Sequence, residues 1–316
     1  MKPFTDFYIN CEANNQLSIA TTVQPTYKNL ACVNYYRYGK EPAVWQGQTV
    51  DYLVINTTEE FSKILSRSFQ LEEYRFRDPV NFSREISDLL LEGHIIWAGV
   101  DLFYWIPGSV LWQKYHVNHY SLVVGYDRRQ KIYYCFDDDL TGYRIREIPE
   151  ERFIEAFSHS GLNPSSYLVK IPAELPPYVT SLEIVLNNAE GIIQSIGAIE
   201  IAGLWNLESS CEKYQTIIDF AMGAIARIAN RQVANGLLFQ HLYESETINE
   251  PLYLESYAAA QELINGWQNI KNIFIKRSMS NKRDLLPETL HRLAAELFGV
   301  ETAMWRNFLA KGRSHV

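Results

Sequence analysis

The chain reads HYSLVVGYDRRQKIYYCFDDD from residue 119 to residue 139. Two runs rich in β-branched and aromatic residues flank the polar stretch 127–130, a pattern typical of two antiparallel strands joined by a tight turn. In a hairpin closed by this turn, His119 lies opposite Asp137 or Asp138, where cross-strand Cβ atoms are about 4.5–5.5 Å apart. A histidine oriented by a carboxylate supplies two members of a nucleophilic triad.

The third member would be a cysteine or a serine elsewhere in the chain, and Cys11 is the candidate. It precedes a stretch, residues 11–23, whose apolar residues group loosely on one side of a helix. The positive end of a helix favours a thiolate, and a nearby imidazolium lowers the thiol pKa further. Backbone N–H groups at a helix N-terminus can also receive an oxyanion. The alternative for Cys11 is a small buried hydrophobic residue, which is what most free cysteines are.

Other residues compete for these roles. His116 can replace His119, although it does not open the strand, and a register shift of one residue exchanges Asp137 for Asp138. The acidic run 137–139 lacks the alternating spacing of a calcium-binding loop, so we expect no metal there. Asp101, at the end of an apolar run, is expected to be a buried carboxylate that at most supports the site.

The remaining pattern predicts two domains. Residues 81–93 predict a helix, and the apolar run 95–105 predicts a buried central strand. Three prolines within residues 172–177 indicate a linker. Further expected elements are a strand over 143–148, a short helix from Pro149, and helices within 182–199, 214–242, 254–275 and 287–309. We therefore expect an α+β chain, with a catalytic domain containing an antiparallel sheet at 1–171 and a mostly α-helical domain at 178–316.

The composition excludes several classes of protein. The chain has 316 residues, 47% of them hydrophobic, and a formal net charge of −8, which argues against nucleic acid as the main partner. We expect no leader sequence and no membrane span. The four cysteines are scattered without a C-x-x-C pair, which favours reduced thiols and a cytoplasmic location.

The combination of motifs resembles the N-terminal domain of the butirosin biosynthesis protein H family, within the papain-like cysteine enzymes. The likeness covers roughly residues 8–170, and a helical companion domain is usual in relatives. Two positions differ from the family pattern, since Asn10 stands where histidine is expected and no glutamine lies five or six residues before Cys11. The residues that carry the resemblance are Cys11, Glu92-Gly93, Val100 to Pro107, Tyr115-His116, His119-Tyr120, Val123 to Asp127 and Asp137.

This resemblance implies an acyltransferase that moves an acyl group from an acyl carrier protein thioester to a small amine, as in antibiotic assembly. Cys11 would be the nucleophile, His119 the general base and acid, and Asp137 the residue that orients His119. No cofactor is implied, and a homodimer is possible. A cysteine peptidase or thioesterase would use the same triad, and a degenerate domain that only binds a carrier protein would not need it. Two interpretations stay open for a group of basic residues near the C-terminus. They form either a cluster that docks an acidic carrier protein or an ordinary solvated helix face, and they are Lys271, Lys276, Arg277, Lys282 and Arg283.

Overall fold

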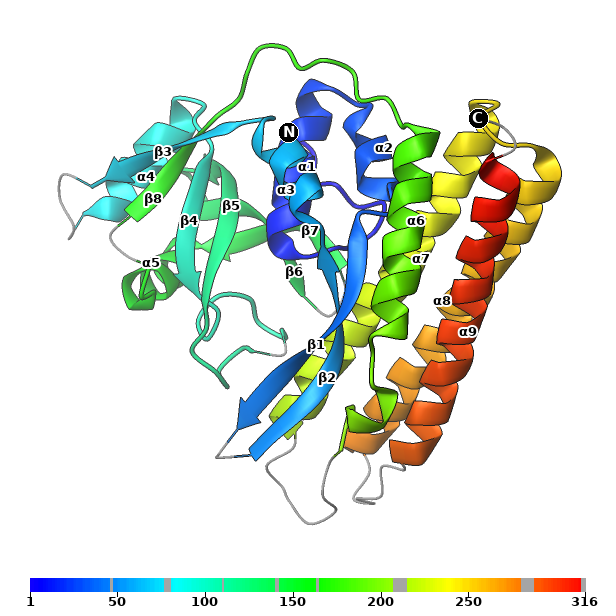
Figure 1. Ribbon diagram of the computed structural model, residues 1–316. Helices are drawn as coiled ribbons and strands as arrows, with labels where there is room; N and C mark the ends of the chain where they lie inside the picture. Colours follow the sequence, from blue (N-terminus) through cyan, green and yellow to red (C-terminus); the bar gives the residue numbers. More distant parts are fainter. Residues whose placement is uncertain are drawn as a thin grey trace. The chain divides into compact units, whose positions relative to one another are not determined.

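The computed structural model describes residues 1–45, 48–76, 81–109, 111–139, 142–162, 165–206, 215–279 and 287–313. It is a mixed α/β structure with antiparallel sheets and a helical C-terminal region (Figure 1). The chain divides into two compact units. We call Met1–Lys28 with Ser62–Pro177 the sheet unit, and Asn29–Phe61 with Tyr178–Val316 the helical unit. The units meet in sequence at residue 177, within the expected linker, but Asn29–Phe61 groups with the C-terminal helices rather than with residues 1–171.

The sheet unit is built on a six-stranded antiparallel sheet in the order β3-β8-β4-β5-β6-β7. The predicted hairpin of strands β5 and β6 lies in this sheet, with Asp127 paired to Ile132 at its turn. The bounds of the strands are Gln70–Arg75 (β3), Ile96–Asp101 (β4), Asn118–Asp127 (β5), Ile132–Asp139 (β6), Gly142–Pro149 (β7) and Ser165–Lys170 (β8).

Helices cover both faces of this sheet (Figure 1). On one face, helices α4 (Phe82–Leu91) and α5 (Glu150–His159) pack through Phe82, Ile86, Phe153 and Phe157. On the other face, Ile19 of helix α1 (Cys11–Val23) packs with Trp97, Leu122 and Phe136. Each such side chain contributes about 1.5–3 kcal/mol when fully buried, so these two layers hold α4 and α5 against one face of the sheet and α1 against the other.

Strand β4 is buried along its whole length, as the apolar run predicts. Its alternate residues Ile96, Ala98 and Val100 enter one core, and Trp97 enters the other. The strand ends at Asp101 rather than continuing to Trp105. The Asp101 carboxylate accepts a hydrogen bond from the backbone N–H of Phe103 at 3.0 Å, which turns the chain out of the sheet.

The helical unit contains the predicted C-terminal helices and a hairpin that the pattern did not predict. Strands β1 (Tyr36–Trp45) and β2 (Gln48–Thr57) form a two-stranded antiparallel sheet. The helices are α6 (Leu182–Gly197), α7 (Gln215–Glu244), α8 (Glu250–Met279) and α9 (Pro287–Gly312), with a short 3₁₀ turn at Ile201–Gly203. Helices α2 (Tyr27–Cys32) and α3 (Glu59–Ser66) lie where the chain passes from one unit to the other.

Candidate active site

The candidate site begins at the N-terminus of α1, where Cys11 is the first helical residue, as predicted. The Asn10 side chain caps the helix by accepting a hydrogen bond from the N–H of Ala13 at 2.8 Å. Among the described residues, the N–H groups of Cys11 and Glu12 have no acceptor, as expected at a helix start. The first turn of α1 therefore presents two free N–H groups beside the Cys11 sulfur.

Helix α1 is fixed to the sheet by polar contacts within its first turns. The hydroxyl of Tyr143, on β7, donates to Oδ1 of Asn15 at 2.5 Å. The N–H of Phe4 donates to the hydroxyl of Ser18 at 2.9 Å, which attaches the N-terminal segment to the helix. These buried contacts determine where the sulfur of Cys11 lies relative to strand β6.

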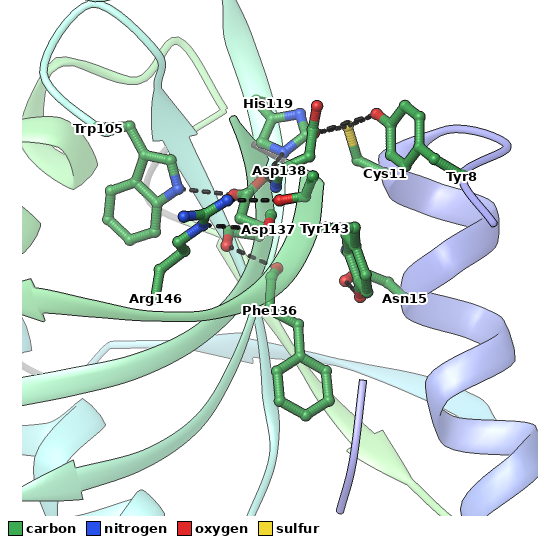
Figure 2. A network of polar contacts seen from close by, with 12 residues as sticks. Tyr8, Cys11, Asn15, Trp105, His119, Phe136, Asp137, Asp138, Tyr143 and Arg146 are labelled. Atoms are coloured by element: carbon green, nitrogen blue, oxygen red, sulfur yellow. Dashed lines mark hydrogen bonds and ion pairs between the residues drawn. The ribbon is translucent and has the colours of Figure 1, made fainter. Parts of the chain in front are cut away.

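The structure brings Cys11, His119 and Asp137 together (Figure 2). Their donor atoms all lie within 4.8 Å of one another. Nε2 of His119 is 3.3 Å from Oδ1 of Asp137, an ion-pair distance, although the angle does not meet hydrogen-bond geometry. The Asp137 side chain is only 2% exposed, against 14% for His119. Oδ2 of Asp137 accepts a hydrogen bond from Nε1 of Trp105 at 2.7 Å, which holds the carboxylate in place.

The expected register of the hairpin is wrong in detail. Val124 forms a bulge in β5, because Val123 pairs with Cys135 while Gly125 pairs with Tyr134. Leu122 pairs with Phe136, so continuing that register places Ser121, not His119, level with Asp137. His119 lies two residues further along the same face and reaches Asp137 diagonally, a distance that long side chains span.

Asp138 projects from the opposite face of β6 and contacts the sulfur instead of the imidazole (Figure 2). Its Oδ1 accepts the Cys11 thiol at 3.3 Å and the hydroxyl of Tyr8 at 3.0 Å. The Tyr8 hydroxyl is itself 3.2 Å from the Cys11 sulfur. Of the two carboxylates left open by the sequence, the structure thus places Asp137 at the imidazole and Asp138 at the thiol. Sequence reasoning missed Tyr8, whose only signal is its position three residues before Cys11.

Burial and charge change the protonation of this cluster. The pKa of Asp137 is lowered, because the charge of His119 and several hydrogen bonds outweigh the opposing effect of burial. The pKa of His119 is raised well above its ordinary value, because the charges of Cys11 and Asp137 outweigh burial, which lowers it. The Asp137 charge acts on the imidazole whether or not the sulfur is ionised, whereas the Cys11 charge acts only when the sulfur is a thiolate.

The pKa of Cys11 differs from the expectation of a readily formed thiolate. Burial raises the pKa of the thiol, and the charges of Asp138 and Asp137 raise it further, against the lowering effect of His119. Burial and the neighbouring charge of Asp137 also raise the pKa of Asp138. At rest the sulfur is therefore a thiol that donates to a carboxylate.

A pocket of about 630 Å³ opens beside Cys11 and His119. Among the lining residues that the structure describes there is no lysine or arginine, and Glu12 is the one carboxylate. The sulfur thus faces a largely apolar and aromatic space with a single negative charge at its edge. The other lining residues are Asn10, Gln16, Leu71, Trp97, Asn118, Tyr120, Leu162 and Tyr167.

The structure pairs His116 with Asp101 and not with Asp137. Nδ1 of His116 lies 2.7 Å from Oδ2 of Asp101, and its ring stacks on Phe103 with the centroids 4.3 Å apart. The His116 side chain is 62% exposed, whereas that of Asp101 is 3% exposed. Asp101 therefore supports His116, and not the pair of His119 and Asp137.

The acidic run 137–139 does not converge on one point. Asp139 pairs with Arg146 at 2.6 Å and with Arg144 at 3.8 Å, while Asp137 and Asp138 face His119 and Cys11. By distance alone, Cys11, His119 and Asp137 could share a metal ion. The imidazole, however, connects the buried carboxylate to the thiol, which is the order of a proton-transfer chain.

Two further cysteines, Cys32 and Cys135, are buried and form no disulfide bond in the described part of the chain. Cys211, Lys282 and Arg283 lie outside the described residues.

A comparison with models of known protein families finds no match to this chain, and a comparison with curated proteins finds none either. Within the described ranges, no helix has both the length and the apolar character needed to cross a membrane.

Proposed function

We propose that the chain is a cysteine-dependent acyltransferase that moves an acyl group from an acyl carrier protein thioester to an amine. The observation that carries this proposal is the chain of contacts from Asp137 through His119 to Cys11 at the edge of a pocket. A nucleophile at a helix start, an imidazole and an orienting carboxylate are the parts of a cysteine-enzyme triad. We further propose a papain-like arrangement of the sheet unit, in keeping with the resemblance to the butirosin biosynthesis protein H family.

The two half-reactions use these groups in order. The Cys11 sulfur attacks the thioester carbonyl, and the departing phosphopantetheine thiolate takes a proton from His119. The amine then attacks the acyl-cysteine, gives a proton to His119 and releases the sulfur of Cys11. Exchange of one thioester for another is nearly isoenergetic, so the acyl-enzyme needs no separate energy source. The raised pKa of His119, to which the Asp137 charge contributes, suits the first step, because it favours the protonated imidazole that the leaving thiolate needs.

The lining of the pocket favours an acyl chain, which binds through apolar contacts, over a peptide segment, which would bind through charged groups. Trp97, Tyr120 and Tyr167 provide aromatic walls beside the sulfur. Glu12, at the same opening, would attract a cationic amine, which gives one proton to solvent before its neutral form attacks and a second proton to His119 as the amide forms.

The acceptor distinguishes this reaction from hydrolysis. A cysteine peptidase or thioesterase would use the same three residues with water in place of the amine. A domain that only binds a carrier protein would leave Cys11 unmodified. We place the reaction in the cytoplasm, in keeping with the free thiols of Cys11, Cys32 and Cys135.

The test is the intact mass of the purified protein after incubation with a panel of acyl pantetheine thioesters. We expect wild type and Cys32→Ala to gain the mass of one acyl group, and Cys11→Ala to gain none. Adding amines should then discharge the acyl group as an amide. Discharge to free acid in the presence of every amine would establish the hydrolase instead, and no mass gain with any thioester would refute a covalent mechanism.

A further inference from the structure

The proposed triad leaves the contacts of Asp138 and Tyr8 unexplained. These two side chains and the sulfur of Cys11 form a closed set of contacts, at 3.0, 3.2 and 3.3 Å. Both residues lie in the partly buried part of the site, and neither lines the pocket. The thiol hydrogen is directed at Asp138 Oδ1, so the structure shows an acceptor for that proton other than His119.

The surroundings of Asp138 suit a group that exchanges a proton. The titratable groups that face its carboxyl are Tyr8, Cys11, His119 and Asp137. Asp137 is committed to His119 and to the indole of Trp105, so it is not placed to take the thiol proton. Burial and the neighbouring Asp137 charge raise the pKa of Asp138, which makes it a better base than an exposed aspartate.

We propose that Asp138 accepts the thiol proton of Cys11 and that the Tyr8 hydroxyl then donates to the oxyanion of the substrate. This inference rests on the proposed acyl transfer and adds two catalytic residues to it. As the bond from sulfur to the carbonyl carbon forms, the thiol proton moves to Oδ1 of Asp138 and the carbonyl electron pair moves to oxygen. Protonated Asp138 can donate to the Tyr8 oxygen, which releases the Tyr8 hydrogen toward the new oxyanion.

The protons balance over one cycle. In acylation, His119 gives its proton to the leaving thiolate while Asp138 holds the proton from Cys11. In deacylation, His119 regains a proton from the amine, and Asp138 returns its proton to the departing sulfur of Cys11. Two proton carriers, one for the nucleophile and one for the leaving group and the amine, match the two titratable side chains beside the sulfur, Asp138 at the thiol and His119 at Asp137.

Tyr8 lies where an oxyanion donor is needed. Its hydroxyl is 3.2 Å from the sulfur, so it is within reach of an oxygen on the carbon that the sulfur attacks. The free N–H groups of Cys11 and Glu12 lie beside the same sulfur and complete the set of donors. Tyr8 would thus take the place of the upstream glutamine that is missing from the sequence.

The test is the rate of acyl-enzyme formation as a function of pH, for wild type, Asp138→Asn and Tyr8→Phe. Matched controls are Asp127→Asn, at the exposed hairpin turn, and Tyr126→Phe, whose hydroxyl contacts Glu150 at the other end of β5. At neutral pH, we expect Asp138→Asn to slow acylation about 100-fold, the usual contribution of a general base. The difference in acylation rate between wild type and Asp138→Asn should become smaller as the pH rises, because hydroxide in solution then removes the thiol proton.

Tyr8→Phe should slow acylation about 100-fold at every pH, because alkaline solution does not replace a lost oxyanion donor. For Asp138→Asn, a result that contradicts the proposal is equally well defined. If Asp138 were only a nearby charge, Asp138→Asn would lower the thiol pKa and leave acylation at neutral pH unchanged or faster.

That outcome, or a Tyr8→Phe variant as fast as wild type, would overturn the inference while the proposed function stands. Absence of acylation in wild type would overturn both. If Asp138→Asn does not fold, Asp138→Ser carries the same prediction, and Tyr8→Phe provides an independent measurement.

Discussion

Asp137 in the sheet unit and Glu301 in the helical unit are both buried carboxylates, yet their surroundings differ. Glu301, on α9, accepts the hydroxyls of Tyr36 and Tyr38, each at 2.6 Å, and the amide of Gln232 at 3.0 Å. All of these partners are buried. Asp137 faces His119, which leads to a thiol at the edge of a pocket.

The folded structure also shifts the pKa values of these two carboxyl groups in opposite directions. Burial raises the pKa of Glu301, since its direct hydrogen-bond partners are neutral donors. The pKa of Asp137 is lowered, because an imidazolium lies beside it and outweighs burial. A buried carboxylate alone therefore does not indicate a reactive site. The informative feature is a connection from that carboxylate, through a second titratable group, to a surface that a substrate can reach.

The largest expected effect separates the two carboxylates by activity. Asp137→Asn should slow acyl-enzyme formation by about 100-fold to 10,000-fold, because His119 loses the charge that orients the ring and stabilises its protonated form. Glu301→Gln should leave that rate unchanged. Single-turnover measurements with one thioester test both variants, and a slow Glu301→Gln enzyme of normal stability would show that both carboxylates take part in the reaction.

The next effect is on stability. Glu301→Ala removes one acceptor from three buried donors, and we expect the free energy of unfolding to fall by about 3–5 kcal/mol. Glu296→Ala, on the exposed side of the same helix, is the matched control. Urea denaturation of the full chain measures both variants, and a small loss in Glu301→Ala would mean that the two tyrosines find other partners.

A smaller effect is the pH dependence of stability. The folded pKa of His119 is raised above its ordinary value of 6.5, so its stabilising contribution is complete below that pH and is lost as the pH rises through the folded value. The difference in Tm between wild type and His119→Gln should therefore be larger at pH 6 than at pH 9. The pKa of Glu301 is also raised in the folded protein, so the stability that protonated Glu301 contributes begins to be lost above pH 4.5. Thermal melts across this range would contradict the assignment if the His119 difference grew toward pH 9.

The smallest effect concerns an exposed carboxylate. Glu255 pairs with Lys311 at 2.5 Å on the surface of the helical unit. Because solvent screens such pairs, Glu255→Gln should leave Tm and acylation unchanged within error. A clear loss of Tm would show that burial is not what distinguishes Glu301 from other acidic residues of this unit.

Local patterns predicted much of this structure. The spacing of the apolar residues within 11–23 correctly predicted that α1 begins at Cys11. The polar stretch 127–130 correctly predicted the turn of the β5–β6 hairpin. The long helices α7, α8 and α9 were predicted for the same reason. Each of these features depends on neighbours within a few turns of the chain.

Features that depend on distant contacts were not predicted. Tyr36 and Tyr38 bind Glu301 across more than 260 positions, and Pro42 within β1 obscures the strand pattern. The raised pKa of Cys11 arises from burial, which the position of this residue at a helix start does not reveal. The proposed function of Tyr8 depends on a carboxylate 130 residues away, so its position three residues before Cys11 is not enough to indicate it.

The bulge at Val124 determines which of two adjacent carboxylates faces the imidazole. Without it, the pairing of Gly125 with Tyr134 would continue unchanged and place Leu122 level with Asp137. Asp138 would then share a face with His119, and Asp137 would take the side of the thiol. A deletion or insertion of one residue in the middle of β5 would thus rearrange the candidate active site, although it leaves the composition of that site unchanged. Redesign of this strand therefore has to preserve its length as strictly as the identity of Cys11.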